Sequence, residues 1–214
     1  MKNFIAILTF LLLAIPITAT AQTEKTQYDE ITPFSEGLAA VRVGNQWGFI
    51  DEDAKLVIDF RDDLVWNKEA DTSIPGVLGI RYPQFKNGRC MIQELKVNNI
   101  PYYGFIDTSG ETVIQPEYLN ITQFDQENAI GIYVREIFQG KNEIKLDIVE
   151  YIFTEVVVNT NGEIVWPIVE REHALTAKRR YETPELRAKL IAKDLLVFKT
   201  KDNKWETKKL NPDL

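Results

Sequence analysis

The chain of 214 residues contains one cysteine and one histidine, Cys90 and His173. A single cysteine forms no internal disulfide, so packing alone must hold the fold together. A zinc site of the usual composition needs several cysteine and histidine ligands, so none is expected. We interpret Cys90 as a buried small residue and His173, which stands among charged residues, as a surface side chain.

Catalytic motifs are also missing from the sequence. No glycine-rich phosphate loop follows a predicted strand. A Ser-His-Asp arrangement would have to use Ser35, Ser73 or Ser109, and none of these lies in a nucleophile-elbow sequence. We therefore predict a protein that is not an enzyme and that uses no cofactor.

Acidic residues are the remaining candidates for chemistry. Six carboxylates occur within 13 positions, at Asp51, Glu52, Asp53, Asp59, Asp62 and Asp63. Calcium takes carboxylate ligands, but the alternation of an EF-hand loop is absent here, so we interpret the cluster as a solvated acidic face. The alternative is a small hydrolase of envelope glycans that uses Asp62 or Asp63, because a pair of carboxylates suffices for glycoside hydrolysis.

An apolar run, Phe4 to Ile17, follows Lys2 at the start of the chain and precedes Ala19-Thr20-Ala21. A basic start, a short apolar core and an Ala-x-Ala site are typical of a secretory signal peptide, here residues 1–21. The alternative is an N-terminal membrane anchor. We predict an exported protein, periplasmic or secreted, with no stable membrane anchor once the signal is cleaved.

Basic residues are scarce before residue 171. Residues 22–170 contain 12 lysines and arginines against 25 aspartates and glutamates, a net charge of −13. Residues 171–214 contain 12 against 7, a net charge of +5. The acidic body argues against a nucleic acid as the partner. The basic tail has three interpretations: it docks on the body, it touches a membrane surface, or it is solvated.

A repeated phrase is the most informative feature that the chain does have. Gly48-Phe49-Ile50-Asp51 returns as Gly104-Phe105-Ile106-Asp107, and each copy precedes a Val-Ile pair at the same distance. Repeat units need their neighbours to bury their apolar faces. We predict copies at about 31–60, 85–118 and 124–167, within a repeat domain of residues 22–170.

Each copy predicts two strands joined by a loop and a third strand after a tight turn. Asp107 and Gly110 mark that turn, with glycine in a left-handed conformation that closes a bulged hairpin. Asn159 and Gly162 keep the pattern in the third copy. Ala54 stands at the glycine position in the first copy, so its turn is expected to be strained or of a different type. The fold class that follows is all-β, with antiparallel hairpin and meander repeats.

These copies resemble the tryptophan-glycine (WG) repeat family of bacteria. The family unit reads approximately Phe-x-x-Gly-Leu-Ala-x-Val, then Trp-Gly-Phe-Ile-Asp, then Gly, Val-Ile and Pro-x-Tyr. The first copy matches with Trp47-Gly48, and the second has Tyr103 in the Trp position. The third copy lacks the Gly-Phe-Ile phrase. The resemblance implies an array of β-hairpins in bacterial, often exported, proteins, and it brings no catalytic residues.

Beyond the repeats we predict a long hairpin and a C-terminal cap. The hairpin pairs Ile130–Phe138 with Ile144–Val158. The cap, residues 171–214, is expected to begin with helix over Arg171–Lys193, because this segment is rich in helix formers, and to end with a hairpin. The further residues assigned to the cap are the helix start Thr183-Pro184-Glu185, the apolar stripe Leu186, Leu190 and Ile191, and the hairpin arms Leu195–Thr200 and Trp205–Leu210.

A long insertion, Arg61–Gln84, separates the first two copies. Its Trp66 and Tyr82 have no place in the repeat pattern, and we predict that they line a binding face. The leading hypothesis is an exported, non-catalytic module that recognises a protein or a cell-surface polymer. A structural envelope protein without a dedicated ligand stays open as a third class.

Overall fold

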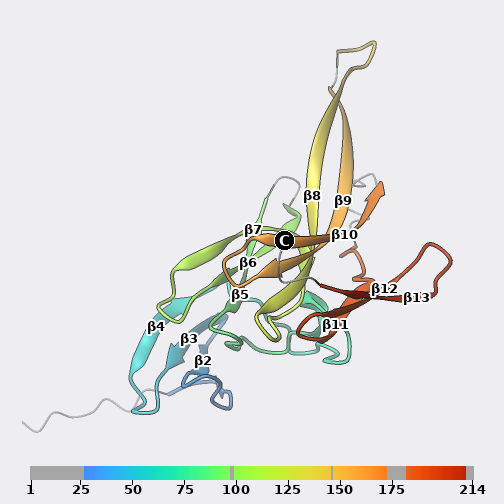
Figure 1. The fold of residues 1–214 in the computed structure, drawn as a ribbon. Helices are drawn as coiled ribbons and strands as arrows, with labels where there is room; N and C mark the ends of the chain where they lie inside the picture. The colour runs from blue at the N-terminus through green and yellow to red at the C-terminus, as the bar shows by residue number, and fades with distance from the viewer. Residues whose placement is uncertain (1–26, 97–98, 146, 173–181, 211–214) are drawn as a thin grey trace, which may run out of the picture.

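The protein is built almost entirely of antiparallel β-structure. The computed structural model describes residues 27–96, 99–145, 147–172 and 182–210 (Figure 1). Three sheets have the strand orders β1-β2-β3-β4, β10-β9-β8-β7-β6-β5 and β11-β12-β13. The predicted signal peptide and His173 lie outside the described residues. Within the described ranges, no helix has the length and apolar character needed to cross a membrane.

The strands are short except in the middle of the chain. The strand bounds are β1 Glu30–Ile31, β2 Ala39–Val43, β3 Gln46–Ile50, β4 Leu56–Arg61, β5 Cys90–Leu95, β6 Pro101–Ile106, β7 Thr112–Ile121, β8 Asn128–Lys141, β9 Asp147–Asn159, β10 Ile164–Glu172, β11 Ala188–Ala192, β12 Leu195–Lys199 and β13 Trp205–Lys209. A 3-10 helix, Val77–Gly79, lies in the insertion between β4 and β5.

Four structural units follow one another along the chain. Unit 1 is β1–β4, unit 2 is β5–β7, unit 3 is β8–β10 and unit 4 is β11–β13. The end of β7 leaves unit 2 and pairs with β8, where Ile121 lies opposite Gly131. The chain after β4 does the same with β5, where Leu64 lies opposite Ile92. Each connecting segment therefore joins its unit to the next, as the repeat pattern requires.

The tight turns of units 1, 2 and 3 share one backbone. In each, an Asp or Asn side chain accepts two backbone N–H bonds: Asp51 from Asp53 and Lys55, Asp107 from Ser109 and Glu111, and Asn159 from Asn161 and Glu163. Ala54, Gly110 and Gly162 have φ values of 60°, 89° and 84°. The predicted turn is confirmed in all three copies. Ala54 holds the same strained left-handed conformation that glycine adopts in the other two.

A second set of turns lies at the Phe-x-x-Gly phrases. The two central residues have positive φ in every copy: Glu36 and Gly37, Asn87 and Gly88, and Gln126 and Glu127. Two successive positive φ values define a type I′ turn, which fits the right-handed twist of a hairpin. The third copy makes this turn without any glycine, which explains why its sequence obscures it.

Hydrogen bonds connect these type I′ turns from one unit to the next, and we call the series the turn ladder. The Glu36 carboxylate accepts the backbone N–H groups of Asn87 and Gly88 at 2.6 and 2.7 Å. The Asn87 side chain accepts the N–H of Glu127 at 3.3 Å. Lys193, after β11, forms an ion pair with Glu127 at 2.9 Å. The ladder thus runs through all four units.

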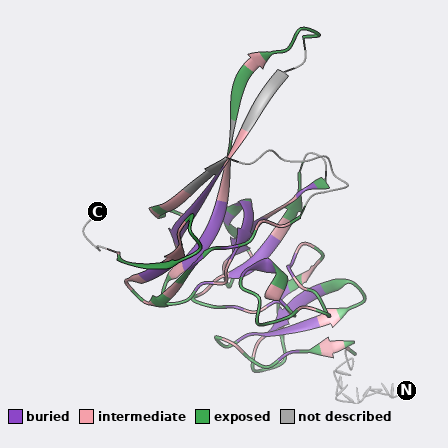
Figure 2. Ribbon diagram, turned by 90° about the vertical axis from the view of Figure 1, so that its right-hand side faces the viewer, coloured by how far each residue is buried: buried purple, intermediate pink, exposed green. Residues whose placement is uncertain are grey.

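Apolar faces stack in the same order as the turns. Ala40, Trp47 and Phe49 of unit 1 share a core cluster with Cys90 and Ile106 of unit 2. Phe105 of unit 2 packs in the same way with Ala129 and Val158 of unit 3. Figure 2 shows buried stretches on the strands of successive units. Burial raises the pKa of the Cys90 thiol to about 12, as expected for a small core residue at the position of Ala39.

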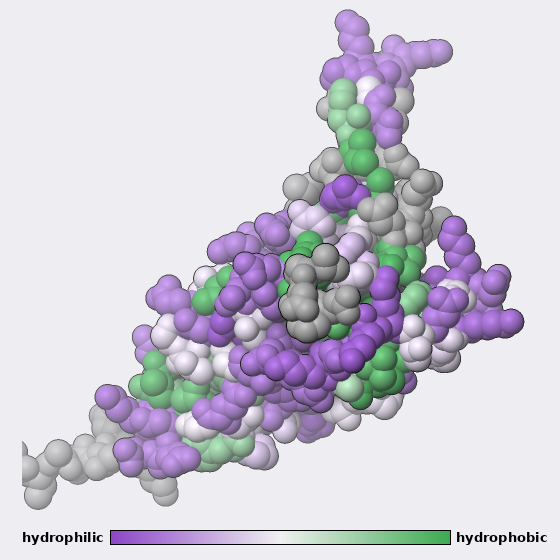
Figure 3. All heavy atoms as spheres, in the orientation of Figure 1, coloured by the Kyte–Doolittle hydropathy of each residue, from purple (hydrophilic) through white to green (hydrophobic). Residues whose placement is uncertain are grey.

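The long hairpin of β8 and β9 projects from the stack, as predicted (Figure 1). Its distal part carries apolar side chains that are exposed to solvent, Phe138 and Ile144 among them. The space-filling view shows a hydrophobic side below a hydrophilic tip (Figure 3). We call this projecting part the arm.

The predicted helical cap is wrong. Residues 182–187 have no regular structure, and the following residues form strand β11 instead of a helix. Residues 173–181 of the predicted helix lie outside the described residues. Leu186 and Ala188 are buried whereas Ile191 is exposed, an alternation that belongs to extended chain and not to a helical stripe. The closing hairpin is confirmed as β12 and β13.

Candidate binding face at the end of the repeat stack

Unit 4 has the strand arrangement of the first half of a repeat. Ala188 pairs with Phe198, and the next residue, Lys199, pairs with Trp205. In unit 1 Ile31 pairs with Val41, and the next residue, Arg42, pairs with Trp47. Trp205 therefore occupies the tryptophan position of a fourth, incomplete repeat.

The packing of unit 4 supports this correspondence. Leu196, at the position of Ala39, is fully buried against Ile130 and Val157 of unit 3. This is the contact that Cys90 and Ala129 make with the units before them. Unit 4 therefore covers the end of the stack through the same face that units 2 and 3 use.

Two buried polar side chains hold the chain in front of β11. The carboxylate of Glu155 accepts the N–H groups of Arg187 and Ala188 at 2.7 and 2.8 Å. Glu155 lies opposite Ile132, at the register position that Trp47 has in unit 1 and Tyr103 has in unit 2. Nothing in the sequence marks Glu155 as standing at a position that is aromatic in units 1 and 2. Its role becomes clear only from the two backbone groups that it binds.

Asn120 provides the second buried contact. Its side-chain oxygen accepts the N–H of Val77 at 3.0 Å, and its amide donates to the carbonyl of Pro184 at 2.8 Å. The insertion and the tail are thus joined through one side chain. Buried polar groups that are hydrogen-bonded in this way help to fix the register of the segments they connect.

The outer side of unit 4 ends the stack, and we call it the terminal face. It carries Trp205 together with Lys189 and Lys199, whose ammonium groups lie 5.0 and 5.4 Å from the indole centre. Trp205 is 51% exposed, whereas Trp47 is 1% exposed. In unit 1 the Arg42 guanidinium lies 5.8 Å from the centre of the Trp47 ring. The Trp66 ring covers the same indole edge-on, with 5.5 Å between the ring centres. The terminal face is therefore a repeat interface without its covering layer.

Positive charge is concentrated around this face. Residues 182–210 contain eight lysines and arginines against five aspartates and glutamates, a net charge of +3. Lys201 and Lys204 lie in the exposed turn between β12 and β13, which is hydrophilic in Figure 3. Two lysines of unit 4 have ion-pair partners among the described residues: Lys193 pairs with Glu127 at 2.9 Å and Lys209 with Asp194 at 3.6 Å. The face combines an exposed indole with several ammonium groups, which suits an anionic partner.

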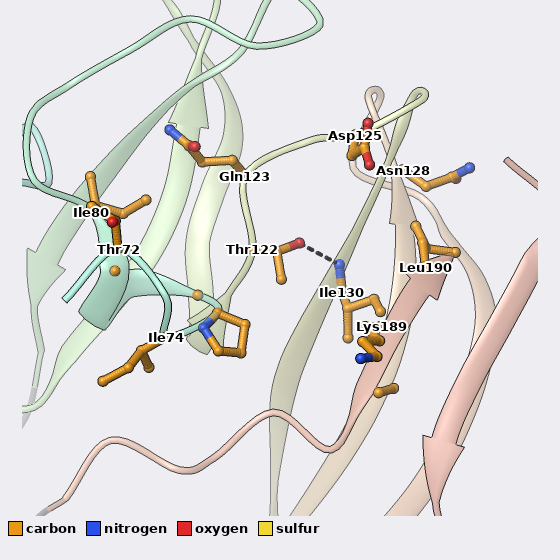
Figure 4. Close-up of a pocket in the computed structure, with 14 residues that line it drawn as sticks. Thr72, Ile74, Ile80, Thr122, Gln123, Asp125, Asn128, Ile130, Lys189 and Leu190 are labelled. Atoms are coloured by element: carbon orange, nitrogen blue, oxygen red, sulfur yellow. Dashed lines mark hydrogen bonds between the residues drawn. The ribbon is translucent and has the colours of Figure 1, made fainter. Parts of the chain in front are cut away.

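A groove of about 270 Å³ lies beside the terminal face (Figure 4). The insertion supplies Thr72 and Ile80 on one side, and unit 3 supplies Asp125 and Asn128 on the other. Lys189 of β11 lines the groove and also reaches over Trp205. The groove thus continues the terminal face around the edge of β11.

Trp66 and Tyr82, the predicted binding residues, lie in a different place. Both are partly buried against the core cluster of units 1 and 2. Trp66 contacts Trp47 and Arg42, so it has a packing role in the repeat. Their use as a binding face stays a prediction. The sequence does not mark Trp205, because it lies six residues after Lys199, whereas Trp47 lies five residues after Arg42.

Asp63 and the three serines considered as catalytic candidates form hydrogen bonds or ion pairs within the fold. Asp63 forms a two-point ion pair with Arg61, at 2.5 and 2.7 Å, which raises the pKa of Arg61. Ser35 donates to the Phe85 carbonyl. Ser73 and Ser109 donate to Asp71 and Asp107. Within the described part of the chain, no group of three His, Cys, Asp or Glu residues is arranged to hold a metal ion. The carboxylate hydrolase stays an untested alternative.

Comparison with known proteins bears on the repeats alone. No curated protein and no solved structure matches the chain. The family model described as WG containing repeat matches residues 25–47 and 103–133. These segments cover β1, β2 and Trp47 of unit 1, the Gly-Phe-Ile-Asp phrase of unit 2 and the start of unit 3. The match confirms the resemblance to the WG containing repeat family that the sequence indicated, over 54 of the 214 residues.

Proposed function

We propose that the protein is an exported, non-catalytic binding module and that the terminal face is its binding surface. The observation that carries this proposal is the half-exposed Trp205 between Lys189 and Lys199. A polar outer face is what a unit at the end of a repeat array needs for solubility. The lysines of unit 4 satisfy that need, but an exposed tryptophan does not, so it calls for a separate role.

Energetics favour such an arrangement for recognition. Tryptophan is enriched among the residues that dominate binding free energy, because a rigid indole buries much area at a low cost in entropy. The surrounding lysines attract an anionic partner and orient it before contact. The predicted partner is therefore an acidic protein segment or an anionic cell-surface polymer.

The test is a binding measurement on the full chain with model polyanions. Poly-L-glutamate and polygalacturonate are the probes, and neutral dextran is the uncharged control. We expect the wild-type chain to bind at least one polyanion and Trp205→Ala to weaken that binding about tenfold or more, as for an interface hot spot. Phe138→Ala is the matched control, because Phe138 on the arm is similarly exposed. Equal binding by the wild-type and Trp205→Ala chains would reject the terminal face as the site.

A further inference from the structure

The free edge of β13 has its own hydrogen-bonding groups. At one end of the β12–β13 hairpin, Thr200 N–H donates to the Lys204 carbonyl, and at the other end Leu210 N–H donates to the Asp194 carbonyl. Successive residues of an antiparallel strand face alternate sides. The even-numbered residues of β13 therefore bond to β12. The N–H and C=O groups of Trp205, Thr207 and Lys209 point to the opposite edge.

Within the described residues, no strand pairs with that edge. In unit 1 the corresponding edge of β3 is occupied by β4, which places Arg61 opposite Trp47 and Ile58 opposite Phe49. In unit 2 the corresponding edge of β6 is occupied by β7. Trp205 and Thr207 stand at the positions of Trp47 and Phe49. The complete units thus supply a template for what can bind at β13.

We propose that an extended, acidic peptide segment of a partner protein adds to β13 as an antiparallel strand and covers Trp205. This inference rests on the proposed function and specifies its partner and its binding mode. The added strand would bond to the outward groups of Trp205, Thr207 and Lys209. Addition of a strand to an exposed sheet edge is a common mode of peptide recognition, in which main-chain bonds give affinity and side-chain contacts give specificity.

Charge determines which strands the edge accepts. Lysines on an edge strand prevent pairing between identical edges because two such edges repel each other. Lys208 and Lys209 lie on β13 itself, and Lys199 lies next to Trp205 across the hairpin. The β4 strand that fills the equivalent edge in unit 1 leads into Asp62 and Asp63. An acidic segment therefore satisfies both the backbone groups and the ammonium groups.

The experiment uses the full chain and a synthetic peptide with the sequence of residues 56–65, which contains three aspartates and one arginine. A scrambled peptide and a peptide with all three aspartates changed to lysine are the controls. We expect the native peptide alone to bind and to slow amide hydrogen exchange of Trp205, Thr207 and Lys209. Binding without protection of these three amides would overturn the proposal.

A proline variant separates strand addition from simple attraction between charges. Thr207→Pro removes one outward N–H and leaves the bonds to β12 intact, a change that edge strands tolerate. Thr207→Val keeps the N–H and is the matched control. We expect Thr207→Pro to weaken peptide binding at least tenfold and Thr207→Val to leave it within about twofold. A circular dichroism spectrum and a melting temperature like those of Thr207→Val establish that the proline variant is folded.

The outcomes separate the two proposals. Peptide binding that is equal in Thr207→Pro and Thr207→Val rejects strand addition, whereas polyanion binding that depends on Trp205 still supports the terminal face. Loss of both peptide binding and polyanion binding in Trp205→Ala, with loss of peptide binding alone in Thr207→Pro, supports both proposals. Peptide binding that is unaffected by Trp205→Ala overturns the assignment of the indole to the peptide site.

Discussion

At the residue scale, the repeats are defined by backbone requirements more than by side-chain identity. One oxygen of Asp51, Asp107 or Asn159 binds two backbone N–H groups in each tight turn. Either an aspartate or an asparagine supplies that oxygen, so the third copy keeps its turn despite the altered sequence. The left-handed residue is less tolerant, because a Cβ atom is unfavourable at positive φ.

Two substitutions test the left-handed position. Ala54→Gly relieves strain in the turn of unit 1, and we expect the free energy of unfolding to rise by about 0–1 kcal/mol. Gly110→Val introduces a β-branched residue at a φ of 89°, and its Cβ would lie 3.2 Å from Ile58. We expect a loss of about 2 kcal/mol or more. Urea unfolding measures both changes, and equal tolerance at the two positions would contradict a shared backbone.

The turn carboxylate gives a pH-dependent prediction. The side-chain hydrogen bond from Ser109, with help from backbone N–H groups, lowers the pKa of Asp107. The stabilisation by Asp107 is therefore present above the pKa that it has in the unfolded chain, and it is lost as the pH falls through its lower folded pKa. We expect Asp107→Ala to cost about 1 kcal/mol at pH 7 and less at acidic pH.

Asp107→Asn is the matched control for that experiment, because Asn159 does the same work in unit 3. Its stability at pH 7 should stay within about 0.5 kcal/mol of the wild-type value. Unfolding curves at pH 7 and pH 3 measure the difference. A pH-independent effect of Asp107→Ala would show that the charge of Asp107 contributes nothing.

At the element scale, strand β11 shows where sequence reasoning failed and why. Alanine, leucine, lysine and arginine around Lys189 favour a helix by intrinsic propensity. The structure buries Ala188 and exposes Ile191, because β11 pairs with β12 and packs on unit 3. Propensity is a weak signal that tertiary contacts override. The hairpins were predictable because the turn residues are local, whereas the position of Glu155 depends on partners more than 30 residues away.

The packing of the tail on unit 3 predicts that two of its apolar side chains, Leu186 and Ile191, contribute differently to stability. Leu186 is 6% exposed in the core cluster shared by units 3 and 4, whereas Ile191 is 53% exposed. We expect Leu186→Asp to destabilise the protein by about 3 kcal/mol, because a charge replaces a buried apolar side chain. Ile191→Asp is expected to change stability by less than about 0.5 kcal/mol. Thermal unfolding measures both, and equal effects would rule out the docked arrangement of β11.

At the scale of the whole molecule, the chain forms an open row of units, with unit 1 at one end and unit 4 at the other (Figure 1). Each unit buries its apolar side on the next one, and unit 4 covers Ile130 and Val157 of unit 3. The sequence showed that the chain repeats but did not show that the tail continues the series. The Gly-Phe-Ile phrase is absent from unit 4, and Glu206-Thr207-Lys208 stands in its place.

Removal of unit 4 tests its role in the stability of the whole row. A chain that ends at residue 172, the last residue of β10, would expose Leu119, Ile130 and Val157, which are fully buried in the complete protein. We expect a lower melting temperature and binding of a hydrophobic dye, because repeat arrays need a terminal unit to cover their last apolar face. An unchanged melting temperature without dye binding would show that units 1–3 are stable without a cap.

The turn ladder has a mechanical consequence. Glu36, Asn87, Glu127 and Lys193 link each unit to the next along one side of the row. A tensile load applied along this side of the row would act on these links in series, so the weakest link would open first. Extension would then proceed in steps of one unit, with a force peak at each step. The row would absorb mechanical energy as it extends. Its maximum extension would increase with the number of repeats.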